Sequence, residues 1–225
     1  MRRLAIVLLL VGAVAARAAD SAIVARVDGT PITEAEVNAV VKGAISGRTQ
    51  PPSSEEIAAL SDAALDSLID LELLYAAARR QGITVSDAQV EAELARSRAR
   101  FPKPADYEAA LKRSGMTAAQ LQADTRKTLV VNVLLERVVW KDVRVTPEAV
   151  RQYYDQHRGE LGDQPFEKLQ PAIERALRDV QRDAAQRAYL LELKKTAVIQ
   201  KGPPPTPAPT ARPTRPPTPV ASQPS

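Results

Sequence analysis

One histidine and two tyrosines are the side chains best placed for chemistry in this 225-residue chain. Tyr153, Tyr154 and His157 lie within five residues, where the histidine could act as a general base and the tyrosines as a binding surface. A histidine in the last turn of a helix more often complements the helix dipole, and half-buried tyrosines more often pack against a neighbouring element. We therefore expect structural roles for all three.

The sequence carries none of the common catalytic motifs. It has no cysteine, which excludes a thiolate nucleophile, a disulfide framework and a cysteine metal site. The HExxH metalloprotease motif, the P-loop and the glycine-rich nucleotide fingerprint are absent as well. Acidic residues of the expected helices fall mainly beside Lys and Arg, the pattern of a solvated surface. We predict a protein that is not an enzyme, with no catalytic residue and no metal or cofactor.

The net charge of +4 comes from the two ends of the chain. Three basic residues lie in the first 18 positions and three more lie after position 200, namely Arg2, Arg3, Arg17, Lys201, Arg212 and Arg215. Without those six, 25 basic residues stand against 27 acidic ones. The part of the chain between the two ends is therefore nearly neutral, which gives no reason to expect nucleic-acid binding.

The N-terminal residues have the pattern of a cleaved secretion signal. Arg2 and Arg3 precede an apolar run over 4–16, and Ala16-Arg17-Ala18 has the small-x-small spacing of a cleavage site. Thirteen apolar residues are too few to span a bilayer, which takes about 20. We predict a signal peptide over 1–18 and a periplasmic mature protein without a stable membrane span.

The segment after the signal is expected to organise the fold. Alternating apolar residues over 23–27 predict a short strand, and Asp28-Gly29 predicts a tight turn. Thr33 and Glu36 form a capping box that starts a helix. Because a lone strand cannot satisfy its own backbone, we expect it to pair with residues 197–199 near the other end of the folded region.

Helix signals dominate the residues between these two strands. Hydroxyl caps with flanking apolar residues mark helix starts, and glycine or proline marks most of the ends. The expected helices cover 34–46, 53–80, 86–99, 105–112, 118–139, 147–157 and 171–196. Apolar residues on several sides of 118–139 indicate that this helix packs on 53–80. On the last helix, one apolar stripe holds Ile173, Leu177, Val180, Ala184, Ala188 and Leu191.

The C-terminal residues have a different composition. Ten of the eighteen prolines lie beyond Gly202, and Val220 is the one bulky apolar residue there. Such a segment cannot build a core. We predict three parts: the signal peptide over 1–18, one helical domain over 19–201, and a disordered, Pro/Thr-rich tail over 202–225.

Several stretches of the helical domain resemble a known family. VARVDGTPITEAEV, ALDSLIDLELLYAAARRQGITVSDAQVEAEL and SGMTAAQLQADTRKTLVVNVLLERVV are similar to the N-terminal chaperone module of the SurA/PrsA family of secreted peptidyl-prolyl isomerases and foldases. VTPEAVRQYYDQHRGEL resembles the helix that leads into that family's parvulin domain, and PFEKLQPAIERALRDVQRDAAQRAYLLELKKTAVI resembles the returning helix and strand. The resemblance implies a mainly α fold: a SurA-like N-terminal helical module closed by the long C-terminal helix, with a two-stranded pairing of the two ends.

The chain departs from that family at the parvulin domain. In the family this domain lies between the last two stretches, where the chain has seven residues, Arg158 to Gln164. A domain needs roughly 50 residues or more. The family's isomerase site also uses histidines with a Cys or Asp, whereas this chain has one His and no Cys. We therefore expect a SurA-like chaperone without the parvulin peptidyl-prolyl isomerase domain.

The resemblance implies a periplasmic holdase that binds unfolded polypeptides, such as outer-membrane or secreted proteins. A groove between the N-terminal helices and the returning helix would bind them, with Phe101, Tyr107 and Met116 as candidate client-binding residues near Pro/Gly connections. Ordinary core or loop packing of these three residues is the alternative. Two other functions stay open: a peptidyl-prolyl cis-trans isomerase by descent, and a structural adapter that acts through the tail. The sequence also leaves open whether the protein forms a homodimer.

Overall fold

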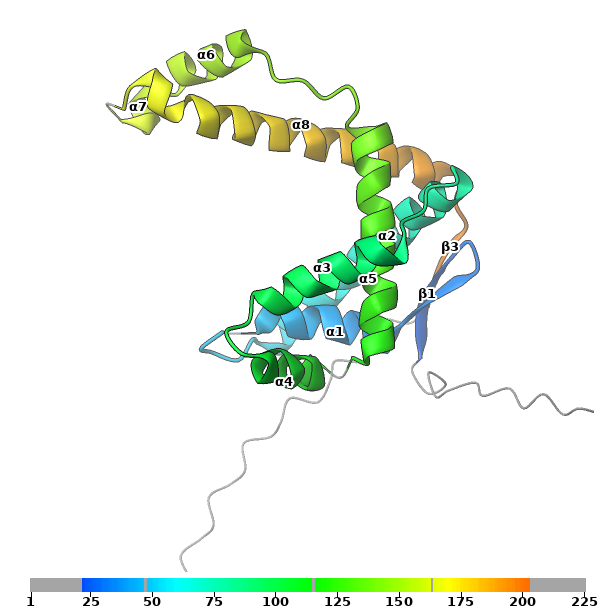
Figure 1. Cartoon of the computed structure of the whole chain (residues 1–225). Helices are drawn as coiled ribbons and strands as arrows, with labels where there is room; N and C mark the ends of the chain where they lie inside the picture. The colour runs from blue at the N-terminus through cyan, green and yellow to red at the C-terminus, as the bar shows by residue number, and fades with distance from the viewer. Residues whose placement is uncertain (1–21, 47, 115, 163, 203–225) are drawn as a thin grey trace, which may run out of the picture.

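The computed structural model describes residues 22–46, 48–114, 116–162 and 164–202 (Figure 1). The predicted signal peptide and residues 203–225 of the predicted tail lie outside these ranges. The described part is mainly helical, as expected. Its strands are β1 (Ile23–Val27), β2 (Thr30–Thr33) and β3 (Ile199–Lys201). Its helices are α1 (Glu34–Ile45), α2 (Ser54–Arg80), α3 (Asp87–Ala99), α4 (Pro104–Ser114), α5 (Ala118–Leu134), α6 (Pro147–Gln156), α7 (Arg158–Leu161) and α8 (Phe166–Thr196), with a π-helical turn η1 (Leu135–Val139) after α5.

The two ends of the described chain meet in one antiparallel sheet with the strand order β2-β1-β3. Ala25 of β1 lies opposite Lys201 of β3, and the Asp28 amide donates to the Val198 carbonyl at 2.9 Å. The predicted pairing of the two ends is confirmed, but β3 begins two residues later than the strand predicted over 197–199. Side-chain and backbone contacts of Asp28 hold Val198 at the entry to the strand.

A third strand, β2, was missing from the prediction. Asp28 and Gly29 both have positive φ values, 49° and 84°, as the two-residue hairpin turns that match strand twist require. The turn therefore folds the following residues back on β1. Pro31 has no N–H to donate to a ladder, which suits β2 to its position at the edge of the sheet.

Capping boxes set the starts of four helices. In each, a Ser or Thr side chain accepts from the backbone amide three residues on, and the Glu or Gln there accepts from the amide of the cap. Such reciprocal bonds satisfy amides that have no partner inside the helix. The pairs are Thr33/Glu36, Ser53/Glu56, Ser86/Gln89 and Thr117/Gln120.

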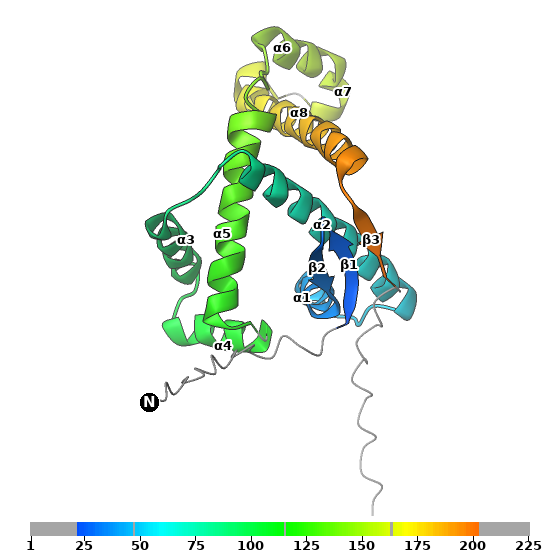
Figure 2. The same cartoon turned by 90° about the vertical axis from the view of Figure 1, so that its right-hand side faces the viewer.

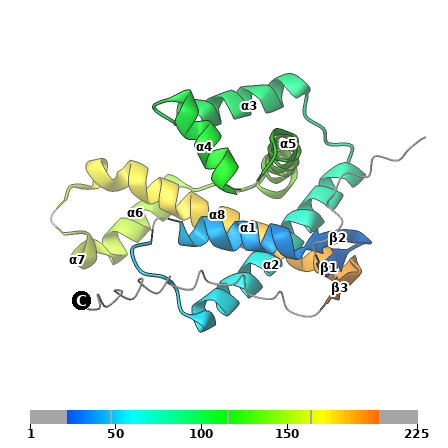
Figure 3. The ribbon, with the colours of Figure 1, turned by 90° about the horizontal axis from the view of Figure 1, so that it is seen from below.

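The main core surrounds α2. This helix contacts α1, α5, α8 and both β1 and β2, and the predicted packing of α5 on α2 is confirmed. Figures 2 and 3 show α1 beside the sheet, with α3, α4 and α5 forming an arm to one side of it. Side chains of every strand, of α1, α2, α5 and α8 and of the π-helical turn meet in this core, and its largest fully buried side chains are Val27, Val37, Leu73 and Leu134.

A second, smaller core lies at the far end of α8. Val150 and Tyr154 of α6 are buried there against Ile173 of α8, and Figure 1 shows α6 and α7 lying beside the N-terminal part of α8. The helix begins at Phe166, five residues before the predicted start at 171. Proline inside a helix removes one hydrogen bond, but the packing of Phe166 on this core outweighs that loss.

Trp140 joins the end of α5 to the middle of α8. Its backbone amide donates to the Leu135 carbonyl at 2.7 Å, which closes the π-helical turn where the sequence predicted a continuous helix. The indole Nε1 donates to the Arg182 carbonyl at 3.0 Å, and the Arg182 guanidinium lies 4.6 Å from the ring centroid. Glu136 pairs with the same guanidinium at 3.2 Å. Glu136 in the turn and Trp140 directly after it thus both contact Arg182 of α8.

Candidate functional site

The lone histidine takes a structural position. His157 is the C-cap of α6, its Nδ1 lies 2.9 Å from the Tyr153 carbonyl oxygen, and its ring stacks on that of Tyr153 at 4.1 Å. Tyr154 is buried, and its hydroxyl donates to the Gln164 carbonyl at 2.8 Å. Among the residues that the structure describes, no group of three or more His, Cys, Asp and Glu could hold a metal ion.

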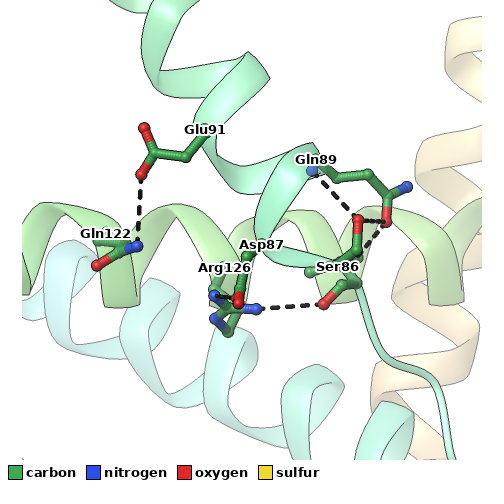
Figure 4. Close-up of polar contacts among 7 residues, drawn as sticks. Ser86, Asp87, Gln89, Glu91, Gln122 and Arg126 are labelled. Atoms are coloured by element: carbon green, nitrogen blue, oxygen red, sulfur yellow. Dashed lines mark hydrogen bonds and ion pairs between the residues drawn. The ribbon is translucent and has the colours of Figure 1, made fainter.

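Polar contacts fix the base of the arm. Arg126 of α5 donates to the Val85 carbonyl at 3.2 Å and to the Asp87 carboxylate at 2.5 Å, as Figure 4 shows for the start of α3. Gln122 donates to Glu91 one turn further along. Together with the buried Val90, these contacts hold α3 firmly on α5.

The tip of the arm is built around an aromatic pair. The rings of Phe101 and Tyr107 meet edge to face with centroids 5.4 Å apart, and the Arg98 guanidinium lies 5.9 Å from the Tyr107 centroid. Both aromatic side chains are half-buried. The structure therefore brings two of the three candidate client-binding residues together. Met116, also half-buried, lies after the other end of α4, which at 11 residues is about 16 Å long.

The packing of α4 is weak compared with that of its neighbours. Its half-buried apolar side chains, Tyr107, Ala110 and Leu111, fall on one face at i, i+3 and i+4 spacing. None of the described side chains of α4 is fully buried, whereas α1, α2, α3 and α5 each bury at least two. The helix contacts α1. We call the apolar face of α4 together with Phe101 the α4 surface.

Two hollows lie elsewhere on the described part of the chain. The larger, of about 770 Å³, lies between α6 and α8 around Phe166, over which the Arg151 guanidinium stacks at 4.8 Å. The smaller, of about 210 Å³, lies between the start of α3 and α5, against Leu129 and Val133. None of the three predicted client-binding residues lines either hollow. Phe166 was not singled out from the sequence, because its helix was predicted to start after it.

A charged cluster lies where α5 crosses α2. The Lys127 ammonium group pairs with the buried Glu72 carboxylate and lies 5.5 Å from the Tyr75 ring centroid. Nearby, partial burial raises the pKa of Asp124, the negative charge of Glu36 raises it further, and Lys127 opposes the shift. These groups connect the arm to the main core.

Comparison with known proteins identifies the N-terminal part of the chain. Residues 3–135 match the family model of the SurA-like N-terminal domain, which is more than half of the chain. The chain belongs to this family. The resemblance to SurA-like chaperone modules is thereby confirmed, and membership of the SurA-like family supports a chaperone role.

Curated relatives of this SurA-like chain are larger proteins. The foldase protein PrsA of Clostridium acetobutylicum is 26% identical over 162 residues, covering 66% of this chain and 48% of that protein. PrsA of Caldanaerobacter subterraneus is 34% identical over 94 residues, 42% of this chain and 25% of that protein. The chaperone SurA of Legionella pneumophila is 27% identical over 136 residues, 58% of this chain and 31% of that protein. The chain spans about half or less of the length of these relatives.

A solved structure shares the fold of this SurA-like chain. It comes from work on PEB4 and Cj1289, described as two structurally related SurA-like chaperones of Campylobacter jejuni. The TM-score is 0.52 at 13% identity, and the match covers 81% of this chain and 99% of the other. The predicted fold class is therefore confirmed, with the correction that the sheet has three strands.

The connection between α6 and α8 is short in this SurA-like chain. The four-residue helix α7 and a loop join them, and α6 and α8 pack directly on each other. The resemblance places a parvulin domain at this point in the wider family. Within the described ranges, none of the helices combines the length and the apolar composition that a membrane span requires.

Proposed function

We propose that the chain is a periplasmic holdase-type chaperone, which binds unfolded outer-membrane or secreted polypeptides without catalysing a reaction. The observation that carries the proposal is the α4 surface. It offers apolar and aromatic side chains on a helix that buries none of its described side chains fully. Family membership supports a chaperone role in general.

The binding physics follows from this weak packing. Apolar contacts contribute about 25 cal/mol for each Å² of apolar area removed from water, so the half-buried side chains of α4 hold it in place less strongly than the fully buried ones hold its neighbours. An apolar segment of an unfolded client would replace those contacts with its own. Many small apolar contacts suit a binder that must accept unrelated sequences and release them without a nucleotide.

The polar contacts at the base of the arm hold the helices next to the α4 surface in place. Because Arg126 and Gln122 hold α3 on α5, the adaptable part is confined to α4 and its connection through Phe101. A client would therefore meet a lightly packed helix next to two helices that are held together by polar contacts. This arrangement limits the entropy that binding must remove from the chaperone itself.

The first test follows light scattering of an unfolded outer-membrane protein diluted into buffer with the mature chain. We expect suppressed aggregation at near-stoichiometric ratios, unaffected by ATP. Ala110→Asp places a charge on the α4 surface and should abolish suppression, whereas the matched control Ala109→Asp, on the exposed side of the same helix, should leave it unchanged. Equal suppression by the two variants would refute the assignment of the site, and no suppression with several unrelated clients would refute the holdase.

Two further experiments separate this proposal from its alternatives. Deletion of residues 203–225 should leave client holding intact, whereas an adapter that acts through the tail would lose its function. A tetrapeptide isomerisation assay should show no rate above background, and catalysed isomerisation would instead support the peptidyl-prolyl isomerase. N-terminal sequencing of the exported protein should begin at Ala19, as a signal peptide over 1–18 requires.

A further inference from the structure

The long helix α8 leaves half of its apolar stripe uncovered. Ile173 is buried against α6 and Leu177 packs beside it, as the predicted stripe requires. Further along the same stripe, Val180 is 63% and Leu191 is 62% exposed. Figure 1 shows that α6 lies beside the N-terminal part of α8 and does not extend along its whole length.

The C-terminal half of α8 uses a different face for the main core. Leu190 is buried there, and Tyr189 and Leu193 pack beside it. At 100° per residue these side chains point away from the line through Val180 and Leu191. The uncovered stripe is therefore a second apolar face of a helix that is already packed, and it consists of Val180, Ala184, Ala188 and Leu191.

The spacing of this stripe is symmetric about its middle. Val180 and Leu191 are 11 residues apart, which is about three helical turns, and the exposed Ala184 and Ala188 lie between them. If two copies of α8 lie antiparallel about this midpoint, Val180 of each copy faces Leu191 of the other. The alanines allow the two backbones to approach closely at the centre.

The charges beside the stripe favour the same orientation. Asp183 and Arg187 lie on one edge of it and have no ion-pair or hydrogen-bond partner within the described ranges. In an antiparallel pair about that midpoint, Asp183 of each copy lies within one residue of the level of Arg187 of the other. In a parallel two-fold pair, the edge that carries Asp183 and Arg187 would lie on opposite sides of the contact in the two copies, so these opposite charges could not pair.

We infer that α8 forms an isologous, antiparallel interface with α8 of a second copy of this chain, through Val180, Ala184, Ala188 and Leu191. A two-fold interface requires a surface that is complementary to itself. This stripe is complementary to itself in both shape and charge. A standard interface buries about 800 Å² per partner, and three turns of helix bury less than that. The dimer is therefore weak and forms with rising concentration. The inference does not depend on the α4 surface or on client holding.

Sedimentation velocity of the mature chain over a concentration series tests this interface. We expect a reversible shift from monomer to dimer, which Val180→Asp should abolish. Ala172→Asp, on exposed α8 surface that lies outside the stripe, is the matched control and should dimerise as the unaltered chain does. A chain that stays monomeric at all concentrations, or equal effects of the two variants, would overturn the inference.

Charge exchange tests the orientation. Asp183→Arg and Arg187→Asp should each weaken the dimer by about tenfold, since each change affects two symmetric contacts, and the double variant should recover the original affinity. Recovery in the double variant requires that the two residues meet across the interface. A double variant as weak as either single one would overturn the antiparallel arrangement.

Single cysteines give an independent check, because the chain has none of its own. Val180→Cys and Leu191→Cys variants, mixed and oxidised, should form a disulfide-linked heterodimer. Each variant alone should cross-link poorly, because its two cysteines lie about 16 Å apart along the helix axis. Efficient cross-linking of each variant alone, without the mixed product, would show a parallel pair and overturn the proposal.

Discussion

Removal of the Lys127 ammonium group should strongly destabilise the fold. Its partner Glu72 is 6% exposed, and the Lys127 side chain is 27% exposed. Lys127→Met would leave a buried carboxylate without its cation, and breaking a buried pair in this way costs about 3–5 kcal/mol. Because Lys127 is partly solvated, we expect the lower end, about 3 kcal/mol, which is a large share of the stability of an ordinary domain.

Trp140 supplies the assay, because it is the only tryptophan of the chain and lies between α5 and α8. Its fluorescence can be followed during unfolding in urea. With a slope of about 2 kcal/mol per molar urea, a loss of 3 kcal/mol lowers the midpoint by about 1.5 M. Circular dichroism at the same urea concentrations checks that helix loss and the fluorescence change coincide.

Two controls separate an unpaired charge from simple loss of a contact. Glu72→Leu with Lys127→Met removes both charges and should return the midpoint to within about 0.5 M of the unaltered chain. Lys201→Met breaks an exposed pair with Asp66, 2.7 Å long, and should cost less than about 1 kcal/mol. The reasoning is refuted if Lys127→Met leaves the midpoint unchanged, or if the double variant is as unstable as the single one.

Three further predictions concern other parts of the fold. The pKa of Asp124 is raised in the folded state. The protonated side chain therefore stabilises the fold most below the ordinary Asp pKa of about 3.9, and this contribution is lost as pH rises through the raised pKa. Asp124→Asn should remove that part of the pH dependence of the urea midpoint. Thr117→Ala removes the cap of α5 and should cost about 1 kcal/mol, against almost nothing for the exposed Ala119→Ser, when both are unfolded thermally. Gly29→Ala must adopt a φ of 84° and should lower the melting temperature, although its Cβ would have free space around it, so an unchanged melting temperature would contradict the hairpin geometry.

Local signals predicted helix starts better than any other feature. Thr33, Ser86 and Thr117 each cap a helix where the sequence placed it, because a capping box involves four neighbouring residues and no distant ones. The start of α8 was missed for the opposite reason. Pro171 is a local stop signal, whereas the contacts that carry the helix back to Phe166 come from α6.

Long-range features were predicted only in outline. The need of β1 for a partner followed from its backbone, but its register with β3 depends on Asp28, which holds Val198 from 170 residues away. For the candidate site, Phe101 and Tyr107 could be grouped because they are only six positions apart, while the length of α4 separates them from Met116. The periodicity of the sequence showed that the apolar residues of the stripe lie on one face of α8. It did not show that α6 covers only half of that stripe.

The sheet also sets an order of events in folding. Because β3 follows α8, the strand that completes the sheet is made after nearly every other described residue. Until Ile199 pairs with β1, one edge of β1 has no partner strand. The chain segment between β1 and β3 is the longest that any strand pairing in this fold must close. Loops of that length slow folding far more than they weaken the final structure. A chain synthesised from its N-terminus therefore cannot complete this sheet until residues 199–201 are available, so the pairing of β1 with β3 is the last to form.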